Sequence, residues 1–340
     1  MERRMGTDMI VPELSEKTFE SAIERVKPSL IDGKLGCALL GVRHNGQEMV
    51  QCLDAKVREV RELRGKVVLL ASVSKAITGT AVARMVDKKV VRWTDPLSKY
   101  LVDMKDGSDN EKITIADVFL HRTGYGDVDP IAPEAIPPYE AYRTILKSGF
   151  KLKPQTAFFY GSTTYWFINA LVHKTLGFTS LQDFLREWLY EPCGMTQTSF
   201  APPPEQRMEL LNYYAGAELD RFMKAEVPAS GLWSSMDDLL KFGQAVITPG
   251  RLMREKTFNE MVEAAPMKKH GEEGFSCRTR GWVKEINFNN QPLHGFFHGG
   301  YTGCVLWCDP KANFVALFMS NNWGTDNSDA FKAISTFYGA

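Results

Sequence analysis

The sequence predicts an α+β fold, with one antiparallel sheet built from both ends of the chain and a helical domain inserted between them. Three observations support this prediction. A segment that alternates around an Asn-Gly turn lies near the N-terminus, at residues 37–53. Helical periodicity interrupted by prolines runs from about Asp95 to Leu240. Strand-like segments separated by turns follow from Gly274, so strands from the two ends can share one sheet.

The N-terminal part is expected to begin with a helix and a hairpin. Apolar residues recur at helical spacing over residues 13–27, which predicts an amphipathic helix that ends at Pro28. The Asn-Gly dipeptide within residues 37–53 predicts a tight hairpin turn. The apolar run Val67–Ala71 then predicts a strand, and the periodicity that starts at Ser72 predicts a buried helix.

The rest of the chain divides into a helical part and a strand-rich part. The expected helices are Ile115–His121, Tyr139–Lys147, Thr163–Leu176, Leu181–Leu189 and Met236–Val246. The expected strands are Cys277–Phe288, Gly295–His298, Thr302–Cys308 and Phe314–Ser320, with turns at 289–292 and 309–313 and a closing helix at Asp329–Phe337. We therefore assign residues 13–94 and 241–340 to a sheet domain and residues 95–240 to an inserted helical domain.

Composition narrows the class of protein. With 340 residues, 44% of them hydrophobic, the chain can bury a large core. Its 41 basic and 41 acidic residues balance, which argues against nucleic acid or an acidic membrane as a partner. No apolar run approaches the roughly 20 residues of a membrane span, and the first residues lack a secretory pattern. Six scattered cysteines are typical of reduced, buried thiols, so the expected location is the cytoplasm.

Ser72 and Lys75 are the first candidates for chemistry. A helix that begins at Ser72 would place unpaired N–H groups and the positive end of its dipole beside the hydroxyl, where they favour a developing oxyanion. Lys75 lies three residues on, so its side chain would rise on the same face. Burial there would lower the pKa of Lys75, and a neutral lysine could take the proton of Ser72. This is the Ser-x-x-Lys pattern of serine acyl-transfer enzymes.

Taken alone, the pair is a weak signal. The pattern recurs at Ser148-Gly149-Phe150-Lys151, in a stretch that is not expected to be helical. A helix-capping serine beside a solvated lysine is the simpler interpretation of Ser72 and Lys75. Motifs elsewhere in the chain are needed to distinguish a catalytic pair from this simpler interpretation.

Tyr160 is a second candidate, because it precedes Gly161 and Ser162 just before a predicted helix. A tyrosine near Lys75 could pass the proton of Ser72 to a leaving group. Tyr160 also belongs to a cluster of aromatic residues, so a place in the core is the alternative.

The stretch His298-Gly299-Gly300 is the third candidate. Glycines on a strand mark the close approach of a ligand or of another backbone. A strand edge beside the nucleophile could offer a backbone N–H as a second oxyanion donor. His298 by itself is equally compatible with a structural histidine.

Together these motifs resemble the class C β-lactamase-related serine hydrolases, a penicillin-binding-protein-like family, and are closest to family VIII esterases and related acyltransferases. The stretches that carry the resemblance are Ala71-Ser72-Val73-Ser74-Lys75, Tyr160-Gly161-Ser162 and His298-Gly299-Gly300, in that order. Lesser matches are Thr94–Tyr100, Leu120–Gly124, Glu191–Met195, Gly231–Leu239 and Thr302–Pro310. The resemblance covers roughly Ser72 to Asn322.

The resemblance implies a β-lactamase/transpeptidase-like fold and an acyl-enzyme mechanism. Ser72 would be the nucleophile, Lys75 its base and Tyr160 a second acid or base. The backbone N–H groups of Ser72 and Tyr301 would form the oxyanion hole. The expected substrate-lining residues are His298, Gly299, Gly300, Ser162 and, at the acyl pocket, Trp233 with the segment Val128–Tyr139. This chemistry needs no metal or organic cofactor.

Two departures from the family pattern shape the expected function. Ser162 replaces the asparagine of Tyr-x-Asn, and His298 stands where many relatives have the lysine of Lys-Thr-Gly, which puts binding of a β-lactam carboxylate in doubt. We therefore expect a serine esterase or an acyltransferase (transesterase) acting on a small-molecule acyl ester or thioester. The alternatives are a β-lactamase or D,D-peptidase, and a non-catalytic binding scaffold of the same fold. The oligomeric state stays open.

Overall fold

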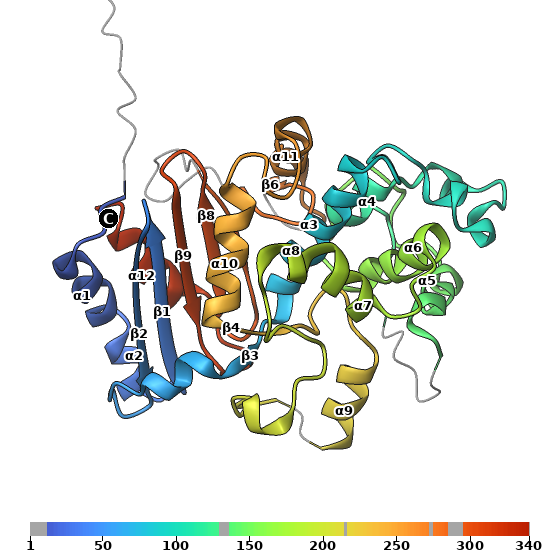
Figure 1. Ribbon diagram of the computed structural model, residues 1–340. Coiled ribbons are helices and arrows are strands. Elements are labelled where there is room, and N and C mark those ends of the chain that lie inside the picture. Colours follow the sequence, from blue (N-terminus) through green and yellow to red (C-terminus); the bar gives the residue numbers. More distant parts are fainter. Residues whose placement is uncertain (1–11, 129–135, 214–215, 272–274, 285–294, 340) are drawn as a thin grey trace, which may run out of the picture.

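Figure 1 shows a computed structural model of the chain, which describes residues 12–128, 136–213, 216–271, 275–284 and 295–339. Its main sheet has five antiparallel strands in the order β2-β1-β9-β8-β7. The strands are β1 (Cys37–His44), β2 (Gln47–Asp54), β3 (Val67–Leu69), β4 (Trp233–Ser235), β5 (Ala265–Lys268), β6 (Phe275–Arg278), β7 (Phe296–Gly299), β8 (Val305–Asp309) and β9 (Phe314–Met319). Strands from both ends of the chain share the main sheet, which confirms the predicted α+β fold.

The helices form the second part of the fold. They are α1 (Glu16–Glu24), α2 (Lys27–Ile31), α3 (Ser74–Asp87), α4 (Ile115–Phe119), α5 (Tyr142–Ser148), α6 (Trp166–Leu176), α7 (Leu181–Leu185), α8 (Glu191–Cys193), α9 (Ala217–Lys224), α10 (Met236–Ile247), α11 (Glu255–Val262) and α12 (Ser328–Thr336). Helices α4 to α7 gather on the side away from the sheet in Figure 1, whereas α8 contacts α10. The domain boundaries given above stay a prediction.

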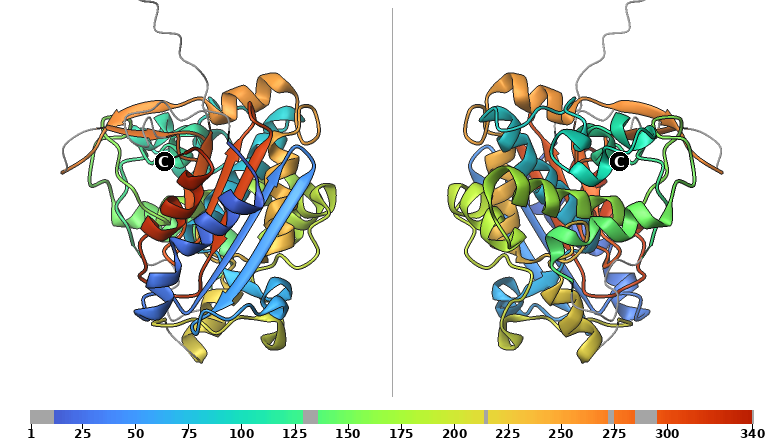
Figure 2. Two further views of the ribbon diagram at one scale, coloured as in Figure 1. Left: turned by 90° about the vertical axis from the view of Figure 1, so that its left-hand side faces the viewer. Right: turned by 90° about the vertical axis from the view of Figure 1, so that its right-hand side faces the viewer.

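Both faces of the main sheet are covered, which explains its continuous apolar strands. Alternate side chains of β9 pack to opposite sides: Phe314, Ala316 and Phe318 meet α1 and α12, whereas the residues between them meet α10. The two views of Figure 2 show α1 and α12 on one side of the sheet and the helical region on the other. All six residues of β9 are buried as a result.

Several element boundaries differ from the predictions for local reasons. Pro28 lies in the first turn of α2 rather than at the end of α1, because proline needs no N–H partner there. The predicted strand Val67–Ala71 ends at Leu69, and a 3₁₀ turn, Ala71–Val73, precedes α3. The predicted long strand Cys277–Phe288 is short in its described part, where β6 ends at Arg278; the predicted turn 289–292 lies outside the described residues.

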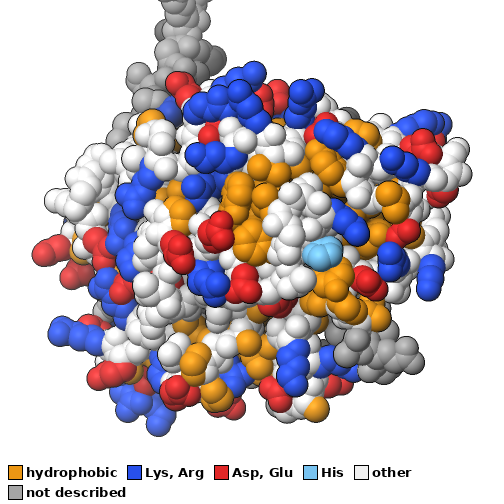
Figure 3. Space-filling view, turned by 45° about the vertical axis from the view of Figure 1, so that its right-hand side comes forward, with side chains coloured by type: hydrophobic (Ala, Val, Ile, Leu, Met, Phe, Trp, Pro, Cys, Tyr) orange, Lys and Arg blue, Asp and Glu red, His pale blue; other side chains and the backbone are white. Residues whose placement is uncertain are grey.

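Charged and hydrophobic side chains are interspersed on the face of the molecule drawn in Figure 3. On the face drawn in Figure 3, lysines and arginines lie among aspartates and glutamates, with patches of hydrophobic side chains between them. Such a mixture lacks the single-sign field that attracts nucleic acid. Within the described ranges, every helix is too short or too polar to cross a membrane.

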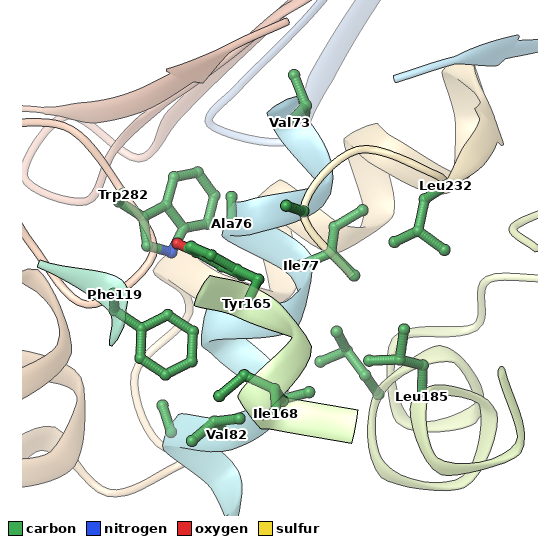
Figure 4. Close-up of a cluster of buried hydrophobic side chains, with 14 of the residues drawn as sticks. Val73, Ala76, Ile77, Val82, Phe119, Tyr165, Ile168, Leu185, Leu232 and Trp282 are labelled. Atoms are coloured by element: carbon green, nitrogen blue, oxygen red, sulfur yellow. The ribbon is translucent and has the colours of Figure 1, made fainter. Parts of the chain in front are cut away.

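Helix α3 is the buried centre of the molecule. Eleven of its 14 residues are buried, including Ala76, Ile77 and Val82. Figure 4 shows these side chains packed among Phe119, Tyr165, Ile168, Leu185, Leu232 and Trp282, which come from segments far apart in the sequence. Buried residues follow one another almost without interruption from Ser74 to Met85, so α3 is packed on every side. The position of the Ser-x-x-Lys motif is therefore fixed by core packing.

Helix α3 also touches the backbone of the turn after β6. A Cβ atom at Gly79 would lie 2.7 Å from the carbonyl oxygen of Arg280 and 2.7 Å from Cα of Gly281. Gly281 has a φ of 103°, and a Cβ there would lie 2.8 Å from Cα of Gly79. The two glycines are needed because two backbones are in direct contact.

We expect Gly79→Ala to destabilise the protein by about 1–3 kcal/mol, because overpacking against backbone outweighs the gain in helix propensity of about 1 kcal/mol. The measurement is the free energy of unfolding in urea. Gly65→Ala is the matched control, since a Cβ at Gly65 meets nothing within 4 Å. An unchanged stability for Gly79→Ala would mean that the two backbones can separate at little cost.

Candidate active site

Ser72 lies in the turn that joins β3 to α3. Ala71, directly before it, has a φ of 45°, which a non-glycine residue rarely adopts. This strained residue turns the chain from the strand into the helix within one 3₁₀ turn. Ser72 therefore sits at the N-terminal end of the helical segment, as the sequence predicts, although α3 itself begins at Ser74.

Lys75 lies below Ser72 and is fully buried. Its Nζ is 3.0 Å from Ser72 Oγ, 3.0 Å from Ser162 Oγ and 3.2 Å from the carbonyl oxygen of Ala229. The carbonyl can only accept, so Lys75 donates to it; a neutral amine can then accept the proton of Ser72 with its lone pair. The simpler interpretation, a solvated lysine beside a capping serine, is wrong.

Tyr160 completes the contacts of Ser72, because its phenol oxygen lies 2.9 Å from Ser72 Oγ. The loop that carries Tyr160 is held by Asp127, whose carboxylate accepts from Ser162 N at 3.0 Å and from Thr163 Oγ1 at 2.9 Å. A Cβ at Gly161 would lie 2.6 Å from that carboxylate, so the glycine after Tyr160 is required by this contact. Tyr160 is 40% exposed and therefore can face both Ser72 and a ligand.

The electrostatics of this group favour proton transfer. Burial lowers the pKa of Lys75 below its ordinary value, and the positive charge of Arg278 lowers it further. Loss of solvation raises the pKa of Tyr160, but the positive charges of Lys75 and Arg278 outweigh this and lower it. Lys75 Nζ lies only 5.0 Å from the centre of the Tyr160 ring, so the two groups titrate as a coupled pair.

The segment Gly299-Gly300-Tyr301 lies against the turn before Ser72. A Cβ at Gly300 would lie 2.2 Å from the carbonyl oxygen of Leu70, so no larger residue fits. Thr302 Oγ1 donates to the carbonyl of Leu69 at 2.9 Å, which ties the two segments together. The predicted close approach of two backbones at this stretch is thus observed.

Asn327 orients the peptide between Gly300 and Tyr301. Its Nδ2 donates to the carbonyl of Gly300 at 2.9 Å, and a Cβ at Gly299 would lie 2.3 Å from its Oδ1. The same carbonyl accepts from Gly303 N at 3.0 Å. In a trans peptide the N–H points away from the preceding carbonyl, so the two bonds together set the direction of the Tyr301 N–H. Within the described part of the chain, neither this N–H nor that of Ser72 donates to another protein group.

A cavity of about 780 Å³ opens in front of Ser72. It is lined by Ser72, Tyr160, Ser162, Arg278 and the run from His298 to Tyr301, with an aromatic wall made by Tyr213, Phe222, Tyr301 and Trp323. The ring centres of Tyr213 and Trp323 are 4.3 Å apart, and those of Tyr301 and Trp323 are 5.3 Å apart. The cavity therefore offers one serine, polar groups and a stacking surface for an apolar substituent.

His298 lines the cavity without carrying a charge. Burial, with the nearby positive charges of Arg278 and Lys75, lowers its pKa well below the ordinary value. Its Nδ1 lies 2.8 Å from the carbonyl of Gly299, so the neutral ring carries its proton on Nδ1. His298 is therefore no substitute for a lysine that would bind an anion.

Trp233 is not where the sequence analysis placed it. Among the described residues it is absent from the cavity lining and lies on β4, opposite Leu69 of β3, packed with Val67 and Met223. Its ring is buried in this cluster because β4 pairs directly with β3. The other expected wall of the acyl pocket is the segment Val128–Tyr139. Residues 129–135 of this segment lie outside the described part of the chain.

Sequence reasoning missed Arg278, Asp127 and Asn327. Each contacts the site from a segment with no motif of its own: Arg278 ends β6, Asp127 lies in a loop and Asn327 precedes α12. His121 also contacts the site, since its ring centre is 4.7 Å from that of Tyr160 and its Nδ1 accepts from Gly161 N at 3.4 Å. It lies in the matched stretch Leu120–Gly124, although the sequence analysis gave it no role. No local pattern marked the other three residues, because their roles depend on contacts made only in the fold.

Comparison with known proteins gives a family match over nearly the whole chain. The Beta-lactamase family profile matches residues 21–338. PbpX of Bacillus subtilis (strain 168) is 24% identical over 266 residues, which are 74% of this chain and 64% of PbpX. The D-alanyl-D-alanine-carboxypeptidase/endopeptidase AmpH of Escherichia coli (strain K12) is 24% identical over 213 residues, 59% of this chain and 54% of AmpH. The chain thus spans between half and two thirds of the length of these relatives.

Solved structures share the fold at low identity. A penicillin-binding protein homologue from Caulobacter crescentus has a TM-score of 0.78 and 16% identity, covering 96% of this chain and 98% of that one. A family VIII carboxylesterase has a TM-score of 0.77 and 16% identity, covering 97% and 99%. EstCE1, described as a hydrolase with promiscuous acyltransferase activity, has a TM-score of 0.75 and 16% identity, covering 95% and 99%. At such identity the likeness establishes the fold alone.

The lowered pKa values of Lys75 and Tyr160 predict how Ser72 should react. Only deprotonated partners accept its proton, so its rate of modification by an alkyl fluorophosphonate should rise with pH. The midpoint should lie below 10.0, the ordinary value for tyrosine. Stopped aliquots analysed by intact mass from pH 6 to 10 give this profile. A rate that is flat over this range would mean that neither group acts as the base.

Proposed function

The chain belongs to the beta-lactamase family, and from this premise we propose that it is a serine esterase or acyltransferase working through an acyl-enzyme. The proposed substrates are small-molecule acyl esters or thioesters. One observation carries the proposal: Ser72 Oγ lies 3.0 Å from Lys75 Nζ and 2.9 Å from the Tyr160 phenol oxygen, at the wall of an open cavity. A nucleophile within reach of both a base and an acid has what acyl transfer requires.

In the proposed first half-reaction, Ser72 Oγ attacks the carbonyl carbon and its proton passes to Lys75 Nζ. The bond from the carbonyl carbon to the leaving oxygen or sulfur breaks, and that atom takes a proton from the Tyr160 phenol. Lys75 then returns its proton to Tyr160. The N–H groups of Ser72 and Tyr301 would stabilise the oxyanion that forms between these steps.

In the second half-reaction, a water molecule or another alcohol or amine attacks the acyl-enzyme. Its proton passes through Tyr160 and Lys75 back to Ser72 Oγ as the acyl bond breaks. Hydrolysis and acyl transfer differ only in this second nucleophile, so both belong to the proposal. The aromatic wall of the cavity could hold an apolar substituent of either partner.

An esterase is favoured over a β-lactamase or D,D-peptidase by two features of the cavity. His298 is neutral, and Ser162 engages Lys75 at 3.0 Å with a side chain too short to reach an amide of the substrate. The family VIII carboxylesterase and EstCE1 show that this fold also serves ester hydrolysis and acyl transfer, although a penicillin-binding protein homologue shares it equally well. If the wild-type protein turned over a chromogenic cephalosporin well above the rate of Ser72→Ala, a β-lactamase would be favoured over an esterase.

The acyl-enzyme predicts a single covalent adduct. Intact protein incubated with an activated acyl ester or with a fluorophosphonate should gain one adduct, which Ser72→Ala abolishes. Ser148→Ala is the matched control, because Ser148 belongs to the second Ser-x-x-Lys match but lies at the C-terminal end of α5, away from any positive helix end. It should label as the wild type does.

Other results would redirect the proposal. An adduct that survives in Ser72→Ala would identify a different nucleophile. Well-folded wild-type protein that forms no adduct would favour the non-catalytic scaffold of the same fold. Acyl transfer would be recognised by a second product when an alcohol or amine competes with water.

Asn327 is expected to act as a positioning residue for the oxyanion hole. Asn327→Ala removes one of the two donors to the Gly300 carbonyl and leaves Gly303 N at 3.0 Å, so the Tyr301 N–H is held less firmly. We expect kcat to fall about 3- to 10-fold with little change in KM, because the weakened interaction is made mainly in the transition state. Steady-state kinetics on an activated acetyl ester measure this split. A rise in KM alone would instead assign Asn327 to substrate binding.

A further inference from the structure

Arg278 is a charged group in the cavity that takes part in no bond-making step of the proposed chemistry, although its charge lowers the pKa of Tyr160 and of Lys75. It is the last residue of β6, is half-buried and lines the same cavity as Ser72 and Tyr160. Its guanidinium carbon lies 4.9 Å from the centre of the Tyr160 ring and 5.5 Å from that of Phe158. Ring contacts of this kind hold a planar guanidinium in place.

Arg278 supplies the positive charge at one end of the cavity. Among the described lining residues, Arg278 carries the permanent positive charge, whereas His298 is neutral. The acidic residue of the lining, Asp326, accepts from Ser328 N at 2.9 Å and lies 3.6 Å from Lys34 Nζ, which also pairs with Asp329. The Asp127 carboxylate at the Tyr160 loop accepts from Ser162 N and Thr163 Oγ1. A substrate beside the Tyr160 ring therefore meets the positive charge of Arg278.

The place of Arg278 relative to Tyr160 decides which part of a substrate it would meet. Tyr160 is the proposed proton donor to the leaving atom, so a group beside its ring lies next to the leaving alcohol or thiol. A guanidinium has five N–H donors, so contacts on one side of the group do not prevent it from binding a ligand on another. Two of those donors match the two oxygens of a carboxylate.

We propose that Arg278 selects substrates whose leaving alcohol or thiol carries a carboxylate. This inference rests on the proposed serine esterase or acyltransferase function and adds the substrate class to it. The natural acyl donor, or the acceptor that uses the same subsite in the reverse direction, is then an anionic small molecule. Arg278 acts in recognition, and Ser72, Lys75 and Tyr160 retain the bond-making steps.

The test compares two acetyl esters of equal size, 4-acetoxybenzoate and 4-acetoxybenzamide, which differ in the charge of the leaving phenol. The readout is the ratio of their kcat/KM values. In Arg278→Gln this ratio should fall about 10- to 100-fold, as expected for a lost charge-assisted hydrogen bond. Arg278→Lys should retain part of the preference because it keeps the charge without the planar fork.

Lys268→Gln is the matched control. Lys268 is an exposed residue of β5, the hairpin partner of β6, and it is absent from the described lining of the cavity. Removing its charge should leave the ratio as in the wild type. A similar fall in this variant would mean that general surface charge, rather than Arg278, sets the preference.

The ratio of kcat/KM values also separates recognition of the carboxylate by Arg278 from an effect of Arg278 on the pKa of Tyr160. Removing Arg278 would raise the pKa values of Tyr160 and Lys75 and slow both esters equally, leaving the ratio unchanged; that result would overturn the inference. The ability of 4-hydroxybenzoate and 4-hydroxybenzamide to protect Ser72 from a fluorophosphonate gives the same comparison without turnover. If the wild-type protein is not labelled at Ser72, the proposed function itself is refuted. Failure of this inference and failure of the proposed function are therefore distinguishable.

Discussion

The burial of the Lys75 amine is the constraint on which the rest of the site depends. A buried lysine without partners is costly, and its charged form is disfavoured. The fold surrounds Nζ with acceptors from two distant segments, Ser162 Oγ and the carbonyl of Ala229, in addition to Ser72 on its own helix. Those contacts hold the amine within reach of Ser72, while its burial keeps its pKa low.

Close backbone contacts bring the remaining pieces to that amine. Gly300 allows the strand end that carries Tyr301 to lie on the turn before Ser72, and Gly281 allows the segment after β6 to lie on α3. Each contact leaves no room for a Cβ, so the glycines are structural requirements rather than flexible points. The turn before α3 and α3 itself therefore fix the positions of Tyr301 and of the segment that follows Arg278.

The charged groups of the lining make one end of the cavity positive. Burial makes His298 neutral, whereas Arg278 keeps a full charge beside Tyr160. The same guanidinium lowers the pKa of the tyrosine and supplies the positive end of the cavity. An aromatic wall that includes Trp323 supplies an apolar surface. In the proposed mechanism, substrate recognition and proton transfer therefore share one residue, and separating the two roles requires a comparison of charged with neutral substrates.

The sequence by itself determined the fold class, the family and the Ser72–Lys75 pair, because period-two and helical patterns and a three-residue spacing are local properties. It also marked Tyr160 and the glycines after His298 as candidates through motifs. Only the tertiary structure decided that Trp233 lies behind the site, on the strand paired with β3, and that Arg278 and Asn327 lie within it. Their roles come from contacts between segments far apart in the chain, which no local pattern of residue types encodes.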